Sequence, residues 1–303
     1  MQVMKKTDRG LSNKNLLNTF VELIRRASSD LPVDVVTAIK EGLLTEKRNS
    51  IAHKTLQMIL KNIDIAREKS LPMCQDTGTP IFYVNYPAKV SQIDIRRKIS
   101  QAIKESVHKL YLRPNIVDTL TGKNLGDRTG PGYPVINFEE WKKDYIRVIL
   151  MLKGGGCENV GTQYALPDSR VNAGRDLEGV RRCILGAVHK AQGRGCSPGI
   201  LGVCIGGDRV SSYEESKRQL LRRIDDKNEN PVLDKLEQSI MKDSNKLGIG
   251  PMGFGGMTTL LGVKIGSLCR IPPSYFVSVT YMCWAYRRRG FEYKAGKVRR
   301  WLY

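Results

Sequence analysis

The spacing of apolar residues is helical in the first part of this chain, whereas strand-like and helical patterns alternate in the rest. This change limits the folds available to the chain. Two segments before residue 121 repeat apolar residues every three or four positions, as an amphipathic helix does. The first contains Ala52, Leu56, Ile59, Ile63 and Ala66, and the second contains Ile95, Ile99, Ile103, Val107 and Leu110. The second helix is expected to end before Pro114, because proline disfavours helical geometry in the preceding residue. The first part of the chain is therefore predicted to be mainly helical.

Beyond a polar, glycine-rich connection at 121–134, β-rich runs alternate with helical segments. Strands are predicted at 145–152, 200–205, 258–265 and 274–281, and helices at 176–191, 213–224 and 233–247. Strand, helix and strand in succession favour an α/β layer. We therefore expect an α/β (α+β) fold, with a helical N-terminal part followed by a mixed sheet with flanking helices. One domain is expected over 1–290, helix-rich in 1–135 and α/β in 136–290, followed by a basic tail at 291–303.

Length, hydropathy and cysteine usage indicate a globular protein of a reducing compartment. The 303 residues are 41% hydrophobic, enough to bury a substantial core in one large domain or two intimate ones. No uncharged apolar run approaches membrane-spanning length, so the cytoplasm is the expected address. Seven cysteines without any C-x-x-C pair favour reduced thiols, or a metal site whose ligands are far apart in the sequence.

The formal net charge of +20 admits nucleic acid, an acidic protein subunit or small anions as partners. Zinc-finger spacing, a ribonucleoprotein aromatic motif and a basic-region zipper are all missing from the sequence, and lysine and arginine are spread along its whole length. A solvated surface with docking patches explains the charge without nucleic acid. The best candidate for a docking surface or an ordered tail is the basic stretch from Arg287 to Arg300.

A turn after the first predicted helix collects groups that can carry chemistry. In Leu71–Thr79, Pro72 and Gly78 punctuate the chain around Cys74, Gln75 and Asp76. Reactive side chains commonly lie on loops that rigid elements hold in place. Cys74 is a soft metal ligand or a nucleophile, and Asp76 is an acid/base candidate or a partner that orients another ligand.

Two glycine-rich segments invite a phosphate-binding interpretation that their context weakens. Gly248–Gly253 fits G-x-G-x-x-G, but a helix is predicted before it and a strand after it, the reverse of a dinucleotide site. A close-packed structural or active-site loop explains it better. Lys153–Asn159 lacks the Gly-Lys-Ser/Thr of a phosphate-binding loop. Its backbone amides could approach an anion, and a tight packed turn is an equal alternative.

Three of the seven cysteines stand at the ends of predicted elements. Cys74 follows Pro-Met, Cys196 precedes a strand, and Cys283 ends one before Trp284. Three thiolates without a fourth would suit an iron–sulfur cluster with one incompletely ligated iron, and ordinary thiols are the alternative. Small buried hydrophobic side chains are the expected role of the cysteines within or beside apolar stretches, which are Cys183, Cys204 and Cys269.

Seven blocks, taken in order, resemble the iron–sulfur hydro-lyases, the family of class I fumarate hydratase and L-tartrate dehydratase. The resemblance is to the α subunit, or N-terminal catalytic region, and runs from about His53 to Arg288. Its blocks are Cys74–Thr79, Leu112–Arg113, Thr121–Asn124, Lys153–Gly156, Cys196–Gly207, Leu247–Gly250 and Cys283–Arg288.

The resemblance implies a site as well as a fold. It implies a 4Fe-4S cluster held by Cys74, Cys196 and Cys283, with the fourth iron open to substrate as a Lewis acid. Gln75 and Asp76 would contact the C4 dicarboxylate, with Asp76 handling the proton of the hydroxyl or water. Arg113 would pair with a carboxylate, and Gly155 and its neighbours would supply backbone amides.

The family pattern is incomplete in this chain. Several members carry a histidine directly after an arginine upstream of the third cysteine, whereas Ile271 follows Arg270 here. A structural role is expected for all three histidines of the chain, which are His53, His108 and His189. Cys157 is interpreted as a neighbour of the cluster rather than a ligand. The family's remaining substrate-binding residues come from a second region or β subunit that this chain does not contain.

The expected protein is the α subunit of an iron–sulfur fumarate hydratase, which adds water reversibly to fumarate to give (S)-malate. It would need a β subunit, and an α2β2 assembly is expected. L-tartrate dehydratase is the nearest rival. An iron–sulfur protein for redox sensing or nucleic-acid binding is the rival from another class.

Overall fold

The computed structural model describes residues 13–303, which divide into two compact units. Unit 1 contains the residues up to Asp30 together with Ala66–Leu152 and Arg287–Tyr303. Unit 2 contains Leu31–Ile65 and Lys153–Tyr286. The chain therefore leaves each unit and later returns to it. Each unit contains residues from both the part predicted to be helix-rich, 1–135, and the part predicted to be α/β, 136–290, and in unit 1 segments far apart in the sequence share one sheet.

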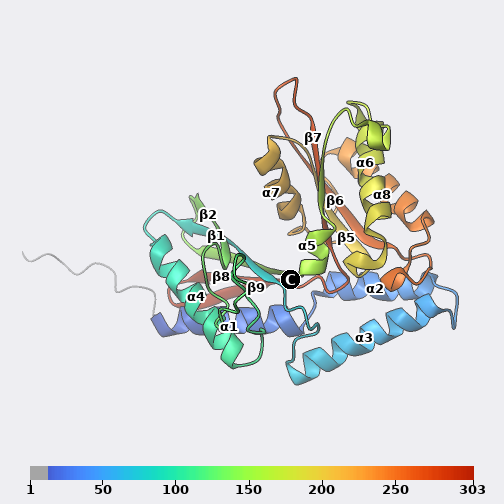
Figure 1. The fold of residues 1–303 in the computed structure, drawn as a ribbon. Helices are drawn as coiled ribbons and strands as arrows, with labels where there is room; N and C mark the ends of the chain where they lie inside the picture. The colour runs from blue at the N-terminus through green and yellow to red at the C-terminus, as the bar shows by residue number, and fades with distance from the viewer. Residues whose placement is uncertain (1–12) are drawn as a thin grey trace, which may run out of the picture. The chain divides into compact units, whose positions relative to one another are not determined.

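Unit 1 is built on a five-stranded sheet in the order β2-β1-β3-β8-β9 (Figure 1). Its strands are β1 (Thr79–Pro87), β2 (Val135–Trp141), β3 (Ile146–Lys153), β8 (Arg288–Lys294) and β9 (Lys297–Leu302). β1 and β2 are parallel, whereas β3 is antiparallel to β8 and β8 is antiparallel to β9. The predicted strand at 145–152 is confirmed as β3, whereas β1 interrupts the part of the chain predicted to be mainly helical.

Two helices complete the core of unit 1. They are α1 (Asn13–Ser29) and α4 (Gln92–His108), which pack against one another. Phe20 of α1 makes edge-on ring contacts with Phe82 of β1 and Phe291 of β8, at 6.2 and 5.6 Å between centroids. All three side chains are fully buried. Such ring pairs add to the burial of apolar area that stabilises the unit.

Residues 291–303, predicted as a basic tail, lie in the sheet instead. They form the second half of β8 and the edge strand β9. Arg289 of β8 donates to the backbone oxygen of Asp30 at 3.1 Å and pairs with its carboxylate at 2.6 Å. Arg288 is fully buried although it lies in a stretch predicted to be a docking surface.

Unit 2 has a four-stranded mixed sheet in the order β4-β7-β5-β6. The strands are β4 (Thr162–Ala165), β5 (Gly199–Gly206), β6 (Leu260–Leu268) and β7 (Phe276–Met282). β7 is antiparallel to β4 and β5, while β5 and β6 are parallel. All residues of β5 are buried, as expected for a central strand covered on both faces.

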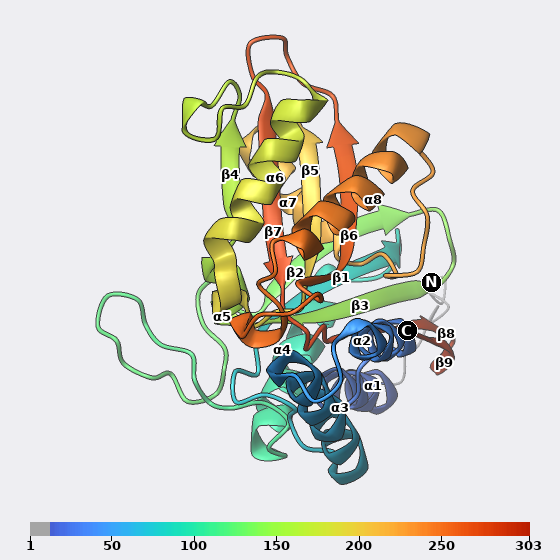
Figure 2. The same ribbon diagram turned by 90° about the vertical axis from the view of Figure 1, so that its right-hand side faces the viewer.

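Helices cover both faces of this second sheet. α6 (Leu177–Ala191) and α8 (Pro231–Lys246) lie on one face, and α7 (Arg209–Gln219) lies on the other (Figures 1 and 2). The remaining helical elements are α2 (Val33–Thr45), α3 (Ile51–Lys69), α5 (Gly155–Asn159), and the 3-10 turns η1 (Ser169–Val171), η2 (Gln192–Gly195) and η3 (Pro251–Gly253). α3 runs from unit 2 into unit 1. The expected α/β (α+β) class, helical at the start and with flanked mixed sheets after it, is confirmed.

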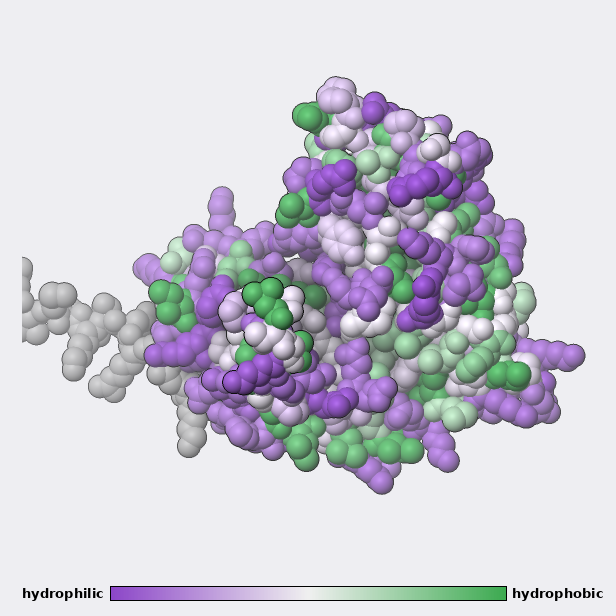
Figure 3. All heavy atoms as spheres, in the orientation of Figure 1, coloured by the Kyte–Doolittle hydropathy of each residue, from purple (hydrophilic) through white to green (hydrophobic). Residues whose placement is uncertain are grey.

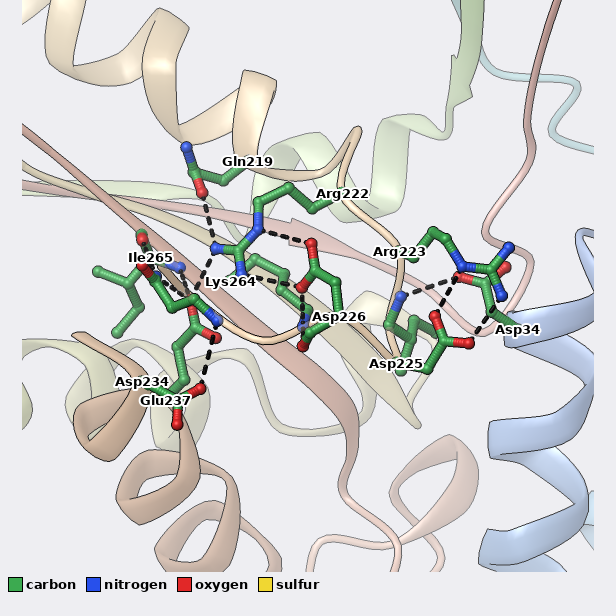
Figure 4. Close-up of polar contacts among 12 residues, drawn as sticks. Asp34, Gln219, Arg222, Arg223, Asp225, Asp226, Asp234, Glu237, Lys264 and Ile265 are labelled. Atoms are coloured by element: carbon green, nitrogen blue, oxygen red, sulfur yellow. Dashed lines mark hydrogen bonds and ion pairs between the residues drawn. The ribbon is translucent and has the colours of Figure 1, made fainter. Parts of the chain in front are cut away.

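A polar network joins the α7–α8 connection to β6 in unit 2 (Figure 4). The Glu237 Oε1 atom accepts from Arg222 Nη1 at 2.8 Å, from Asn228 Nδ2 at 2.7 Å and from the backbone N–H of Ile265 at 2.7 Å. The buried Lys264 ammonium pairs with Asp226 Oδ1 at 2.6 Å. Each buried charge in this network therefore has a partner, which offsets the cost of removing it from water.

Hydrophilic side chains cover much of the face drawn in Figure 3, with hydrophobic ones scattered among them. Some of the basic residues form short-range surface pairs, such as Arg97 with Asp94 and Arg223 with Asp225. Pairs of this kind contribute little stability because water screens them. No helix in residues 13–303 is both long enough and apolar enough to span a membrane.

Candidate active site

The turn that carries Cys74 follows α3 directly, as the sequence predicts. α3 ends at Lys69, and the backbone N–H of Met73 donates to Ser28 O at the end of α1, at 3.1 Å. Cys74 and Asp76 are half-buried, and the Gln75 side chain is exposed. α3 is therefore followed by a short segment, Cys74–Asp76, whose polar side chains are at least partly accessible to solvent.

The structure brings Arg113 to this turn from further along unit 1. Its Nη1 atom donates to Gln75 O at 3.0 Å, and its backbone N–H donates to Thr77 Oγ1 at 3.2 Å. The Asp76 Oδ1 atom accepts from the backbone N–H of Gly78 at 2.9 Å, which closes an Asx turn. Gln75, Asp76 and Arg113, singled out from the sequence, therefore lie together.

Two buried arginines that sequence reasoning missed complete the turn. Arg128 donates to Thr77 Oγ1 and to Gly78 O, and Arg287 Nη1 donates to Asp76 O at 2.7 Å. Both side chains are almost fully buried, at 2% and 1% exposure. Arg128 lies in the polar connection and carried no local signal. Arg287 falls in the family block Cys283–Arg288, but it also opens a stretch predicted to be surface, so no contact with the turn was expected of it.

In unit 2, Cys196 and Cys283 lie at the same end of the sheet. Cys196 follows η2 and precedes β5, and Cys283 follows β7, with Ile200 of β5 opposite Met282 of β7. The backbone N–H of Trp284 donates to Cys196 O at 3.3 Å. Cys196 adopts a left-handed conformation with φ of 56°, uncommon for a residue with a side chain.

The Tyr281 ring packs against the two glycines that flank the Cys196 turn. A Cβ atom on Gly195 would lie 2.5 Å from this ring, and one on Gly199 would lie 2.2 Å from it, so both glycines leave the space that the ring fills. Burial raises the pKa of Tyr281, and the nearby thiols of Cys283, Cys157 and Cys196 raise it further. Three of the seven thiols therefore lie around one buried phenol.

The glycine loop before β6 packs against the same turn. Ser197 Oγ donates to Gly250 O at 2.6 Å, and the backbone N–H of Met252 donates to Ser197 O at 2.8 Å. α8 precedes this loop and β6 follows it, which is the order that argued against a dinucleotide site. The observed contacts are those of a close-packed loop.

The glycine-rich turn after β3 also lies on this side of unit 2. The Lys153 ammonium, buried at 2% exposure, pairs with Glu158 Oε2 at 2.6 Å, and Lys217 holds the other oxygen of this carboxylate. Burial alone would raise the pKa of Glu158, but the two lysines bring it below its usual value. The pairs hold the start of α5, where Gly155 is exposed.

The model of the family described as fumarate hydratase (fumerase) matches residues 17–292. This chain belongs to the fumarate hydratase family. The resemblance drawn from the sequence motifs is thereby confirmed.

Relatives within the fumarate hydratase family carry two kinds of name. The chain is 50% identical over 295 residues to a putative fumarate hydratase class I of Geobacillus stearothermophilus, covering 96% of this chain and 57% of that protein. It is 34% identical over 273 residues to a putative L(+)-tartrate dehydratase subunit alpha of Methanocaldococcus jannaschii, covering 88% of this chain and 94% of that one. It is 29% identical over 275 residues to the L(+)-tartrate dehydratase subunit alpha of Escherichia coli K12, with 90% and 88% covered. The chain thus spans little more than half of the length of the Geobacillus stearothermophilus protein.

The thiols of this family member suit an iron–sulfur cluster in their chemistry. Iron–sulfur clusters take cysteine thiolates, and Cys196 and Cys283 present two at one end of a sheet. Cys74 belongs to unit 1. Within residues 13–303, no three or more histidine, cysteine, aspartate or glutamate side chains converge as a ready-made metal-binding group. The three-cysteine ligand set therefore stays a prediction.

The other cysteines of this family member divide into buried and exposed. Cys183 in α6 and Cys204 in β5 are buried, and burial raises the pKa of each thiol to about 12, so both stay protonated at neutral pH. These two predictions of a small buried side chain are confirmed. The same prediction is wrong for Cys269, which is exposed just after β6. The burial of Cys269 was predicted from its apolar neighbours in the sequence, but one of them, Ile271, is itself 67% exposed.

Proposed function

We propose that this chain is the α subunit of an iron–sulfur fumarate hydratase that hydrates fumarate reversibly to (S)-malate. The observation that carries the proposal is the assembly of Gln75, Asp76 and Arg113 at one turn, in a member of the fumarate hydratase family. The 50% identity to a protein named as a putative class I fumarate hydratase favours this substrate. L-tartrate is the second candidate, because the tartrate dehydratase alpha subunits are matched over most of their length.

Cys74, Cys196 and Cys283 would hold a 4Fe-4S cluster in this proposal. Bound there, the cluster would supply an iron with an open position, whose Lewis acidity eases breakage and formation of the C–O bond. Cys157 would be its neighbour and not its ligand. The seven cysteines all lie within the described residues and none of them is joined in a disulfide there, which suits a reducing compartment such as the cytoplasm.

Arg113 would bind one carboxylate of the substrate. A guanidinium has five N–H donors, and only one of them is used for Gln75 O. The rest of this exposed side chain can therefore fork onto a carboxylate while the contact with the turn is kept. Gln75 would hydrogen-bond the substrate from the adjacent position, and Gly155 would offer its backbone amide.

Asp76 would take and return the proton of the water or hydroxyl group. Its Oδ1 atom is oriented by the Gly78 N–H, and Arg287 holds its backbone oxygen. A carboxylate fixed in this way meets the geometric requirement for general acid–base catalysis.

A second subunit would complete the site. The relatives called subunit alpha imply a β partner, and the chain spans 57% of its fumarate hydratase relative. We therefore propose an α2β2 assembly, in which the β subunit brings the remaining substrate-binding residues.

The test is turnover of fumarate and of L-tartrate by the anaerobically co-purified complex, with Asp76→Asn and a matched control, Asp64→Asn. Asp64 lies on the exposed face of α3. We expect fumarate to be the better substrate, and Asp76→Asn to lower kcat by about 10²–10⁴-fold with the cluster absorbance unchanged. Asp64→Asn should match the wild type. Absence of fumarate hydration by the complete complex, or full activity in Asp76→Asn, would contradict the proposal.

The cluster ligands have a separate test. We expect Cys74→Ser to lose cluster absorbance and activity together, whereas Cys269→Ser, on the exposed thiol, should keep both. An intact cluster in Cys74→Ser would refute this ligand assignment. If the chain instead binds nucleic acid with a steep dependence on salt and without hydratase activity, the rival class is correct.

A further inference from the structure

Arg128 is a buried cation that meets only neutral oxygen atoms. It is 2% exposed, and its guanidinium donates to Thr77 Oγ1, to Gly78 O and to Tyr133 Oη, the last at 3.1 Å. Within residues 13–303, no carboxylate forms an ion pair with it. Burying a charge without a counter-ion costs free energy, and apolar packing would hold a merely structural turn at lower cost.

The backbone at Arg128 is also held in an uncommon conformation. Its φ is 59°, in the left-handed region where residues other than glycine are rare. The residue before it, Asp127, accepts at Oδ1 from the Thr129 N–H and hydroxyl at 2.9 and 2.7 Å, and pairs at Oδ2 with Lys104 of α4 at 2.7 Å. The contacts of the neighbouring Asp127 therefore help to hold Arg128 in a backbone conformation that is unfavourable for an isolated arginine.

Thr77 connects this arginine to the proposed substrate-binding residues. It is fully buried, and its Oγ1 atom accepts from the Arg128 guanidinium and from the backbone N–H of Arg113. A hydroxyl oxygen has two acceptor positions, and both are used. One oxygen atom thus links the backbone of Arg113 to the turn that holds Gln75 and Asp76.

We propose that Arg128 and Thr77 are a positioning pair that fixes Arg113 relative to Asp76. This inference rests on the proposed function, in which Arg113 binds a carboxylate and Asp76 moves a proton. Neither member of the pair is required to touch the substrate. Misplacing a reacting group by about 1 Å can cost about 10²-fold in rate. The pair would therefore affect the rate only by keeping Arg113 and Asp76 at the correct distance from one another.

Three variants test the pair in the full chain with its partner subunit. Thr77→Val keeps the shape and removes the shared oxygen, while Thr77→Ser keeps the oxygen and is the matched control. Arg128→Gly removes the guanidinium and keeps the backbone unstrained, because glycine adopts positive φ readily. We expect Thr77→Val and Arg128→Gly to lower kcat by about 10–100-fold and to raise KM, with Thr77→Ser within about threefold.

The double variant and the Michaelis constant separate positioning from general stability. Since the two residues share one contact, Thr77→Val with Arg128→Gly should lose no more than the worse single variant. A merely structural role would lower the amount of folded protein and leave KM unchanged for the fraction that folds. Unchanged KM and kcat in Thr77→Val, or fully additive losses in the double variant, would overturn the inference.

A measurement without turnover decides the inference independently of the proposed function. Hydrogen exchange of the Gly78 amide, which donates to Asp76, should be faster by at least about tenfold in Thr77→Val and unchanged in Thr77→Ser. Equal exchange in both variants would overturn the pair. If the wild-type complex hydrates neither acid, the proposed function fails, and the exchange rates still show whether the pair holds the turn.

Discussion

Gly199→Ala should displace the Cys196 turn, and the structure gives the size and sign of the effect. The new Cβ atom would lie 2.2 Å from Tyr281 Cζ and 2.3 Å from its hydroxyl oxygen. Carbon atoms rest at about 3.5–4.0 Å, so ring and strand must separate by more than about 1 Å. Tyr281 is 2% exposed, so its ring is packed among other buried atoms.

The expected cost is about 3 kcal/mol, at the upper end of the usual range for overpacking a core. For a unit of this size, that corresponds to a fall in Tm of about 6–12 °C, measured by calorimetry of the full chain. The sign is informative, because replacing glycine by alanine without a clash stabilises a protein by about 0.4–1 kcal/mol. We also expect the variant to bind less of the proposed cluster, since Cys196 lies only three residues before Gly199.

Two companion variants show whether the ring is the cause. In a Tyr281→Leu background the ring is gone, so adding Gly199→Ala should cost less than about 1 kcal/mol. Gly262→Ala, on neighbouring β6, is the control, because its Cβ would lie 3.3 Å from a methyl group of Ile224, which can yield slightly. A raised Tm in Gly199→Ala, or the same loss with and without the Tyr281 ring, would refute the reasoning.

Further predictions concern charge and thiol reactivity. Glu237→Gln should lower the free energy of unfolding by about 1–3 kcal/mol in urea titrations, because the Arg222 contact loses its charge, whereas a neutral effect would show that the network contributes little. The side-chain hydrogen bond from Lys104, then those from Thr129, lower the pKa of Asp127 to about 2. Its stabilising contribution should therefore be complete above about pH 4 and be lost as the pH falls towards 2, a dependence that Asp127→Asn should remove. Under native conditions a maleimide should label exposed Cys269 and spare Cys204, and the reverse order would contradict the burial.

Elements with a clean apolar period could be predicted from the sequence, and those defined by distant partners could not. The predicted helices at 176–191 and 233–247 correspond to α6 and α8, each with one buried face. β8 was missed because Arg288 and Arg289 suggest a surface. These arginines are buried only because β3, β9 and Asp30 surround them, and none of these contacts is local in the sequence.

The candidate site shows the same limit. Gln75, Asp76 and Arg113 could be identified because their residue types and the family motifs point to chemistry. Arg128 carried no such signal, since an arginine in a polar connection is ordinarily solvated and its contact with Thr77 spans 51 positions. Groups that position others are found by tracing hydrogen bonds, and motifs alone do not reveal them.

The place of β8 in its sheet has a consequence for synthesis on the ribosome. β3 pairs with β8, yet residues 154–287 separate the two strands. At ordinary rates of translation this edge of β3 stays unpaired for of order ten seconds after it emerges. During that time it can pair with another chain, as any open strand edge can. We therefore expect slower translation between Lys153 and Arg288 to increase aggregation of the nascent protein, and faster completion of β8 to reduce it.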